Sequence, residues 1–435
     1  MQNKWILVTT AEEGTWPNEN NNILFLGEWC KLYDRKNIWQ NLNYKVVGYH
    51  WNDRKKFHKD YYQIDLIYEA VLISLSNIFN KIHGESHDEN YWRIICGPWL
   101  GYFLQVLFDR WMSIEQAYQN YQIEKVICFD NNLEYQISND CETFVRGVID
   151  DYWNSLLISE IIKFKGFNSQ ICKDKLNINK YITNHKSKNK NKIYLKFSNI
   201  IKKLFFYFNH INSKSDNYFI THPCINRFEN SLLQLNLGQI PRFWGKQNTP
   251  FFKIKSKYRE WHIILQKESY PNELKQFCDL ALKLIPKYLP RTYLEGYKSL
   301  KKSSITKEWP SNPKSIFTCG RIYTDDIFKI WLAQKVENGS KLITGQHGGV
   351  YGIARISFYE SHQLKISNKF ISWGWNIKNN SKIKKLGILN YSNKKLKYSN
   401  EGNIFLLQNC YSRYGTWISS SIRSAEQWEK YFEFQ

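Results

Sequence analysis

A histidine and an amide stand in a glycine-rich turn late in the chain, directly after an apolar run. The stretch 341–352 reads KLITGQHGGVYG, which places Gln346 and His347 next to Gly348 and Gly349. Glycines allow backbone N–H groups to approach a phosphate, and a histidine there can stabilise a leaving phosphate by a hydrogen bond or a charge. Because ligands of open α/β sheets bind beyond the carboxyl ends of strands, we predict that these residues serve a donor phosphate. A structural histidine in a turn is the alternative.

Polar and aromatic residues in and after this turn could complete a nucleotide-sugar donor site. Glu360 and His362 lie 13 and 15 residues after His347, and a carboxylate can hold the hydroxyls of a ribose. Tyr351 lies inside the turn, and Trp373 closes the next expected strand, where an indole ring can line a base or sugar pocket. Polar residues on a surface helix and tryptophans packed in a core are the alternatives.

Charged and aromatic residues in the N-terminal half point to an acceptor side. Glu28 follows a short apolar run, and a carboxylate at the edge of a cleft can act as a general base on an acceptor. Trp29 offers a ring that can stack on a sugar, and Arg93 can bind an anion. Asp109 and Arg110 are adjacent and can either bind an acceptor or be ordinary charges on a helix surface.

Several catalytic signatures are missing from the sequence. It contains no G-x-G-x-x-G, Walker A loop, H-E-x-x-H or G-x-S-x-G, so nicotinamide, P-loop, zinc-protease and esterase chemistry lack their usual support. Asp325 and Asp326 are adjacent, but no second acidic cluster stands out. We therefore expect neither a cofactor nor a metal.

Short apolar strands and amphipathic helices are expected to position these residues. Strands are predicted at 4–10 and 22–30, and apolar residues in 64–82 recur at three- and four-residue steps, which predicts a helix. A second, almost wholly apolar helix is expected to begin near Pro98, because proline is favoured at the first helical position. After 309–313 a β-α-β rhythm indicates a parallel, Rossmann-like sheet.

This pattern predicts an α/β chain with a domain boundary near 300–312. Residues 1–300 then form an N-terminal domain, with an insertion at 173–215, and residues 312–435 form a C-terminal Rossmann-like domain. We count about four strands after the boundary, the last at 403–409, whereas a doubly wound domain usually has about five or six. We therefore expect the C-terminal domain to be incomplete.

The positive charge of the chain is concentrated in one segment. The formal net charge is +22, and between Lys173 and Lys203 ten lysines accompany one acid, Asp174. Such charge favours an anionic partner, for example nucleic acid, a membrane surface or a phosphorylated substrate. Apolar residues at 195–208 recur mostly at helical spacing between lysines, which is typical of an interfacial amphipathic helix. A solvated insertion that packs on its own domain is the alternative.

Cysteine usage and hydropathy bear on the compartment. The nine cysteines form no C-x-x-C pair, so we expect neither a zinc site nor a disulfide framework, and a reducing compartment fits better. The N-terminus has no apolar core of a signal peptide, and no run of 18 apolar residues predicts a transmembrane helix. The sequence therefore predicts a cytoplasmic protein, and leaves open a peripheral contact with the inner face of the cytoplasmic membrane.

The chain resembles a transferase family of bacterial surface-polysaccharide and O-antigen biosynthesis loci. The resemblance covers about residues 5 to 420 and rests on the stretches FLGEWC, YWRIICGPWLGYFLQVLFDRW, LPRTYLEGY, GSKLITGQHGGVYG, YESHQLKISNKFISWGW and NCYSRYG. Together these stretches are specific, whereas any one alone would be weak. The Gln-His-Gly element is also similar to the His-Gly motifs of capsule-building transferases, including the retaining β-Kdo enzymes.

The resemblance implies a GT-B-like glycosyltransferase, with two Rossmann-like domains facing a cleft. By that similarity the C-terminal domain binds a nucleotide sugar with His347 facing the donor phosphate, and the N-terminal domain binds a lipid-linked or growing glycan. The basic segment would then touch anionic lipid, and no nucleic acid is expected. Two alternatives stay open: transfer of another phosphate-activated group, such as glycerol phosphate, and a non-catalytic basic protein that binds membranes or nucleic acid.

Overall fold

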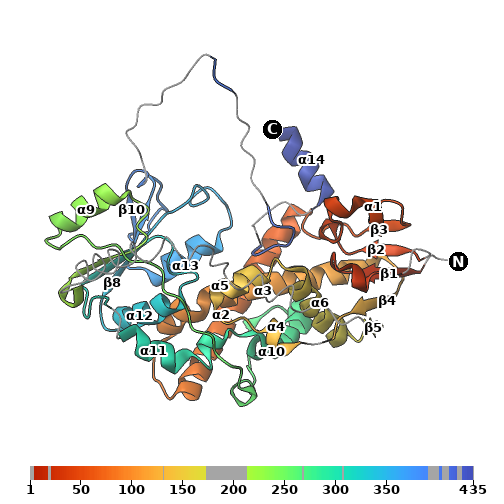
Figure 1. The fold of residues 1–435 in the computed structure, drawn as a ribbon, viewed down its shortest axis with the longest axis horizontal. Helices are drawn as coiled ribbons and strands as arrows, with labels where there is room; N and C mark the ends of the chain where they lie inside the picture. The colour runs from red at the N-terminus through yellow and green to blue at the C-terminus, as the bar shows by residue number, and fades with distance from the viewer. Residues whose placement is uncertain are drawn as a thin grey trace, which may run out of the picture.

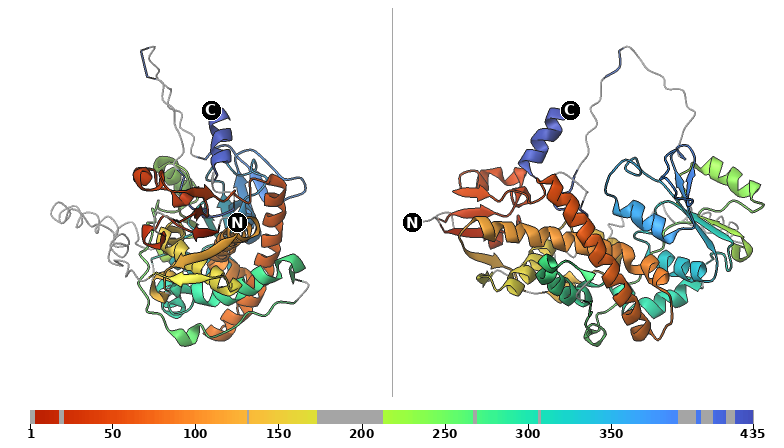
Figure 2. Two further views of the ribbon diagram at one scale, coloured as in Figure 1. Left: turned by 90° about the vertical axis from the view of Figure 1, so that its right-hand side faces the viewer. Right: turned by 180° about the vertical axis from the view of Figure 1, so that it is seen from behind.

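The computed structural model describes residues 4–17, 21–130, 132–172, 213–266, 269–305, 308–389, 401–403, 411–418 and 424–434. The lysine-rich segment up to residue 212 and all but the first residue of the strand expected at 403–409 lie outside these ranges. Two β-sheets occupy opposite ends of the molecule, and long helices run between them (Figures 1 and 2). None of the described helices combines the length and the apolar character that crossing a bilayer requires.

The first sheet contains five parallel strands in the order β3-β2-β1-β4-β5. Both predicted strands of the N-terminal region are present, since β1 and β2 pair in register from Ile6 with Ile23 to Val8 with Phe25. All residues of β1 and β2 are buried, as expected for short apolar runs inside a parallel sheet. The strands are β1 (Trp5–Val8), β2 (Ile23–Phe25), β3 (Tyr44–Val46), β4 (Ile123–Cys128) and β5 (Ser169–Ile171).

Two long helices follow the first three strands and form the centre of the molecule. The predicted helix over 64–82 is part of α2 (Arg54–His83), which Asp53 caps by accepting from the backbone N–H groups of Lys55 and Lys56. The chain then turns through Gly84, whose φ of 69° lies in the left-handed region. The other helices among the described residues of this half are α1 (Lys36–Trp39), α4 (Leu133–Gln136), α5 (Cys141–Gly147) and α6 (Asp151–Lys165).

The second long helix, α3 (Glu89–Asn120), begins earlier than expected. The sequence predicted a start near Pro98, but Pro98 lies inside the helix. Asp88 provides the actual N-cap, because its carboxylate accepts from the backbone N–H of Tyr91. The proline is tolerated in a helix that is buried along most of its length.

The second sheet also contains five parallel strands, in the order β10-β9-β8-β7-β6. The expected β-α-β rhythm is present from β7 onward, and the helices α12 (Asp326–Glu337) and α13 (Phe358–Ile366) form the crossovers before and after β8. The edge strand β6 lies upstream of the boundary expected at 300–312, and it pairs in register with β7. The second sheet therefore takes one strand from the region assigned to the N-terminal domain. The strands are β6 (Tyr218–Ile220), β7 (Ser315–Thr318), β8 (Lys341–Gly345), β9 (Lys369–Ser372) and β10 (Ile383–Lys385).

Helices of the second half pack on α3 and join the two sheets through one core. Both α12 (Asp326–Glu337) and α13 (Phe358–Ile366) contact α3. On α13, the rings of Phe358 and His362 lie over Gly101 and Gly97 of α3, where any added Cβ would meet them. The part of this half that the structure describes also contains α9 (Arg227–Asn236), α10 (Lys275–Tyr288), α11 (Tyr297–Ile305) and α14 (Ala425–Phe434).

The C-terminal residues return to the first sheet. Residues 411–418 lie against α3 and α6, where the backbone N–H of Ile418 donates to Gln105 and Gly415 accepts from Arg110. The last helix, α14, lies beside α1 and β3 in Figure 1, away from the second sheet. Its start is tied to Asn52, which accepts from Ser424. The chain therefore crosses from the first half to the second and back.

Candidate functional site

Gln346 anchors the glycine-rich loop that follows β8. The residue is buried, and its side-chain oxygen accepts from the backbone N–H of Trp373 at 2.9 Å and from the indole of Trp375 at 2.7 Å. Its amide nitrogen donates to the carbonyl of Gly348 at 2.8 Å. Gln346 therefore fixes the loops after β8 and β9 to each other, so its role is to position these loops.

His347 lies at the carboxyl end of β8, as the sequence predicted. The residue is exposed, and its Nδ1 lies 3.0 Å from the hydroxyl of Tyr351. The hydroxyl of Tyr351 also lies 3.1 Å from that of Tyr323, which follows β7. The rings of Tyr323, Tyr351 and Tyr359 surround the imidazole at centroid distances of 5.8, 5.2 and 6.4 Å. Although the residue as a whole is exposed, the tyrosines enclose part of its ring, and this partial burial lowers the pKa of His347, which favours a neutral imidazole near neutral pH.

The glycines of this loop differ in what they permit. A Cβ added to Gly348 or Gly349 would meet no atom within 4 Å, so open space adjoins the backbone at both positions. Gly352 instead has a φ of 72°, and a Cβ there would lie 2.5 Å from the ring of Trp375. Gly352 is therefore needed by the fold, whereas Gly348 and Gly349 leave room for a ligand beside the backbone.

The residues of α13 that the sequence assigned to the donor lie in two different environments. The carboxylate of Glu360 accepts from the backbone N–H of Gly352 at 2.7 Å, and burial raises its pKa. Glu360 also lines a cavity of about 1140 Å³ between α13 and α2. His362 is buried against α3, and neither ring nitrogen has a hydrogen-bond partner among the described residues. The structure thus brings Glu360 near the loop and places His362 in the core.

Trp373 lies at the carboxyl end of β9, beside the loop of His347. Its backbone N–H is held by Gln346, and its indole N–H is buried without a partner among the described residues. An unpaired buried donor is costly, so a ligand oxygen at this position would be stabilised. The structure therefore brings together Gln346, His347, Gly348, Gly349, Tyr351 and Trp373 at one edge of the second sheet.

The acceptor-side residues lie around the first sheet. Glu28 begins the 3₁₀ turn Glu28–Cys30 after β2, pairs with Lys31 at 2.9 Å and lines a cavity of about 170 Å³ together with the start of α14. Trp29 is buried, and its indole donates to the carbonyl of Thr9 at 3.1 Å. Glu28 is therefore accessible, whereas the ring of Trp29 is committed to the packing of the sheet edge.

The three charged residues predicted on α3 are held by protein partners. Arg93 pairs with the carboxylates of Glu69 and Glu89 at the wall of the larger cavity. Asp109 is buried and pairs with Arg110 and with the imidazole of His50 at 3.1 Å. These are not ordinary charges on a helix surface, because the side chains of Asp109 and Arg110 are enclosed. A role in acceptor binding stays a prediction.

Sequence reasoning missed a cluster at the carboxyl edge of the first sheet. Asp151, at the start of α6, pairs with Arg413 and accepts from the hydroxyl of Tyr414 at 2.6 Å. Arg413 also donates to the carbonyl of Trp29 at 2.6 Å. The only sequence signal was the NCYSRYG stretch, which contributed to the resemblance without a role for any residue.

The segment 411–418 links the two predicted halves of the site. The ring of Tyr414 lies 5.9 Å from that of Trp29, on the acceptor side. Three residues later, the ring of Trp417 lies 5.3 Å from that of Tyr359, which also packs against His347. Residues from both sheets therefore meet through one short stretch of the chain.

A family model matches the chain over residues 5–435, and its description is LIC12162 family transferase. The chain belongs to this family. Neither the curated proteins nor the solved structures include a match to it. Membership of the LIC12162 family supports the transferase part of the resemblance over nearly the whole chain.

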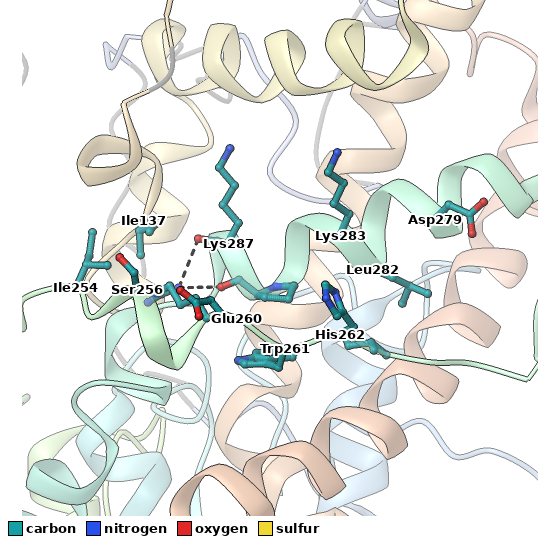
Figure 3. Close-up of a pocket in the computed structure, with 13 residues that line it drawn as sticks. Ile137, Ile254, Ser256, Glu260, Trp261, His262, Asp279, Leu282, Lys283 and Lys287 are labelled. Carbon is teal, nitrogen blue, oxygen red and sulfur yellow. Dashed lines mark hydrogen bonds between the residues drawn. The ribbon is translucent and has the colours of Figure 1, made fainter.

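Another cavity of this LIC12162-family chain lies away from the predicted site. It has a volume of about 530 Å³ and lies between residues 254–263 and α10 (Figure 3). One wall includes Arg259, which donates to the carbonyls of Pro286 and Leu289 and so caps the end of α10. Because this cavity shares no residue with the loop of His347, it carries no argument about the donor. Among the described residues, no group of three acidic, histidine or cysteine side chains could hold a metal ion.

Proposed function

We propose that this protein is a GT-B-like glycosyltransferase that moves a sugar from a nucleotide-activated donor to a growing surface polysaccharide, such as O-antigen or capsule. The observation that carries the proposal is the exposed imidazole of His347 at the carboxyl end of β8, beside two glycines with open space at their Cα atoms. Membership of a transferase family supports transfer as the reaction class.

The donor binds at the edge of the second sheet. The backbone around Gly348 and Gly349 receives the diphosphate, and the unpaired indole N–H of Trp373 offers a further donor. His347 stabilises the leaving phosphate by donating a hydrogen bond, while Tyr351 fixes the orientation of the ring. No metal is required for this role, because the loop itself supplies donors to the developing charge.

The acceptor approaches from the first sheet. Glu28 is our candidate for the general base, since it is accessible and lines a cavity at the end of β2. Asp151 lies at the same edge, but Arg413, Tyr414 and the backbone N–H of Ala11 already occupy its oxygens. The acceptor is a lipid-linked or growing glycan, and we place the protein in the cytoplasm with its basic segment toward anionic lipid.

A thermal-shift panel of nucleotides and nucleotide sugars tests the donor site. The wild-type chain should be stabilised by one nucleotide class in a concentration-dependent way, because a ligand that binds only the folded state raises its stability. His347→Ala should retain the unliganded melting temperature within a degree or two and should abolish sugar transfer. The exposed His262, which lies in the other cavity, provides the matched control His262→Ala.

The outcomes of this panel separate the alternatives. If a cytidine nucleotide carrying glycerol phosphate stabilises the protein and no nucleotide sugar does, the result would support glycerol phosphate transfer instead of sugar transfer. Binding that ignores all nucleotides and falls steeply with salt would favour the non-catalytic basic protein. A large loss of unliganded stability in His347→Ala would mark His347 as a structural histidine.

A further inference from the structure

Two cysteines from neighbouring loops meet at the carboxyl edge of the second sheet. Cys224 follows β6 by four residues, and Cys319 directly follows β7. In the parallel pairing of these strands Ile220 lies beside Phe317, and two residues later the backbone N–H of Cys319 donates to the carbonyl of His222 at 3.0 Å. The two loops therefore leave the sheet side by side, although the cysteines are 95 residues apart in the sequence.

The side chains of the pair are in contact. The thiol of Cys319 donates to the carbonyl of Pro223 at 3.2 Å, which places its sulfur beside Cys224, the next residue along the chain, and the two thiols influence each other electrostatically. The strand register continues into the loops, so His222 lies opposite Cys319 and Cys224 follows two residues later. Cys224 has a φ of 55°, which is unusual for a residue with a side chain and shows that the loop is closely constrained there.

The two thiols differ in reactivity and in access. The neighbouring thiol of Cys319 lowers the pKa of Cys224 to about 7, and the proximity of Cys224 raises the pKa of Cys319. Cys224 is half-buried and Cys319 is buried. An accessible sulfur that is partly thiolate near neutral pH is the nucleophile in thiol chemistry. The interaction with the Cys224 thiol is the largest cause of the raised pKa of Cys319, so this cause disappears once Cys224 is in a mixed disulfide, and Cys319 can then resolve it.

We propose that Cys224 and Cys319 are an oxidation site that closes to an intramolecular disulfide when the protein meets a low-molecular-weight disulfide such as oxidised glutathione. The thiolate of Cys224 attacks one sulfur of the reagent, forms a mixed disulfide and releases one thiolate. Cys319 then loses its proton to solvent and attacks the sulfur of Cys224, which releases the second thiolate. The protein loses two electrons and two protons, and the reagent is reduced to two thiols.

The bridge would act on the loop of His347 through Cys319. The backbone of Cys319 lies within hydrogen-bonding reach of the imidazole of His347, and its carbonyl accepts from the side chain of Gln363 at 2.8 Å. A Cβ on Gly345 would lie only 2.8 Å from the sulfur of Cys319, so β8 leaves this sulfur little room on that side. Drawing the sulfur of Cys319 toward Cys224 therefore displaces the backbone that contacts His347.

Other cysteines of the chain provide the comparison. Burial raises the pKa of Cys30, Cys96, Cys141 and Cys278, which should leave them unreactive. Cys172 is half-buried, and its thiol donates to the carbonyl of Gly14 rather than to a second sulfur. Cys172 is therefore a matched control, because it is half-buried as Cys224 is, but its thiol contacts no second cysteine in the described structure.

Differential alkylation and peptide mapping of the full chain, before and after oxidised glutathione, test the site. We expect a peptide cross-link between Cys224 and Cys319 that dithiothreitol reverses and that Cys172→Ser leaves unchanged. Cys319→Ser should instead accumulate the glutathione adduct on Cys224. Hydrogen exchange of 345–352 should rise on oxidation of the wild type and stay constant in Cys319→Ser.

Two results would overturn the inference, and neither depends on transfer activity. The proposed oxidation site would be wrong if Cys224 is alkylated no faster than Cys172 and no cross-link forms at any ratio of oxidised to reduced glutathione. If the cross-link forms but the hydrogen exchange of 345–352 stays unchanged, the disulfide does not act on the loop of His347. Both measurements use the unliganded protein, so a failure of the glycosyltransferase proposal would leave them interpretable.

Discussion

Gln346 and His347 are adjacent in the sequence and have opposite roles in the loop after β8. Gln346 is buried and uses both ends of its amide to hold Trp373, Trp375 and Gly348. His347 is exposed and is positioned by Tyr351. A neutral imidazole that donates a hydrogen bond suits a site in which the backbone amides already carry positive potential. Gln346 thus holds the loop in place, and the imidazole of His347 is the exposed group of the loop that can react.

The position of this loop could be predicted from the sequence, but its surroundings could not. An apolar run that ends in glycines predicts a strand end, and the carboxyl ends of parallel strands hold ligands. Tyr323 and Tyr359, which set the environment of the imidazole, come from other segments and carry no local pattern. The burial of His362 could not be predicted either, because it results from a contact with Gly97, which lies more than 260 residues earlier in the sequence.

His362 should make the stability of the protein depend on pH. Burial, with Arg93, Lys329 and Lys365 nearby, lowers the pKa of His362 to about 3, while Glu69 opposes the shift. Between the unfolded pKa near 6.5 and the folded pKa, the unfolded chain binds the proton and the folded chain does not. The free energy of unfolding should therefore fall as the pH drops below about 6.5, by up to about 1.4 kcal/mol per pH unit from this group.

Urea unfolding of wild type and His362→Gln at pH 7.5, 6.5 and 5.5 measures this contribution. The variant lacks the titrating group, so its free energy of unfolding should fall less steeply with acid than that of the wild type. The absolute stability of the variant is of no consequence here, because only the difference in slope is compared. Parallel slopes would mean that the imidazole of His362 is not held neutral in the fold.

At the scale of elements, α3 and α13 interlock through glycines and rings. Gly97 and Gly101 lie one turn apart on α3, and His362 and Phe358 lie one turn apart on α13. Rings placed on Cα atoms let the helices approach more closely than side-chain packing would allow. The sequence predicted both helices but not their contact, since hydrophobic periodicity identifies an apolar face without naming its partner.

Gly101→Ala should destabilise the protein, although alanine is the better helix former by about 1 kcal/mol. A Cβ at this position would lie 2.0 Å from the ring of Phe358, so the ring or the helix must move. We expect a loss of about 1–3 kcal/mol in the free energy of unfolding, the range for overpacked cores. Chemical denaturation measures it.

The control is another helical glycine, Gly147 of α5, where a Cβ would lie 3.4 Å from Trp153 in ordinary contact. Gly147→Ala should be neutral or slightly stabilising. Adding Phe358→Leu to Gly101→Ala should restore part of the loss, because the smaller side chain leaves room for the methyl group. If Gly101→Ala and Gly147→Ala have equal effects, the helices do not interlock as described.

At the scale of the whole molecule, the order of the elements does not follow the expected division into an N-terminal and a C-terminal half. The edge strand β6 comes from upstream of the expected boundary, and residues 411–418 return to the first sheet. Strand-by-strand reasoning predicted β1, β2 and the parallel second sheet, because apolar runs and turns are local signals, whereas two Rossmann-like domains were implied only by the resemblance. It could not assign β6 to the second sheet, since strand pairing is decided by contacts across nearly 100 residues.

The contacts of 411–418 with the first sheet should be local, so weakening them should not unfold the second sheet. Arg413 pairs with Asp151 and donates to the carbonyl of Trp29, and its side chain is 36% exposed, so Arg413→Gln should cost only about 1 kcal/mol. Hydrogen exchange should rise at 411–418 and at the turn after β2, while β7 and β8 keep their protection. The exposed pair of Arg146 with Glu142 supplies the control Arg146→Gln, which should change neither region. A rise in exchange across both sheets would mean that this segment holds the whole molecule together rather than one edge of it.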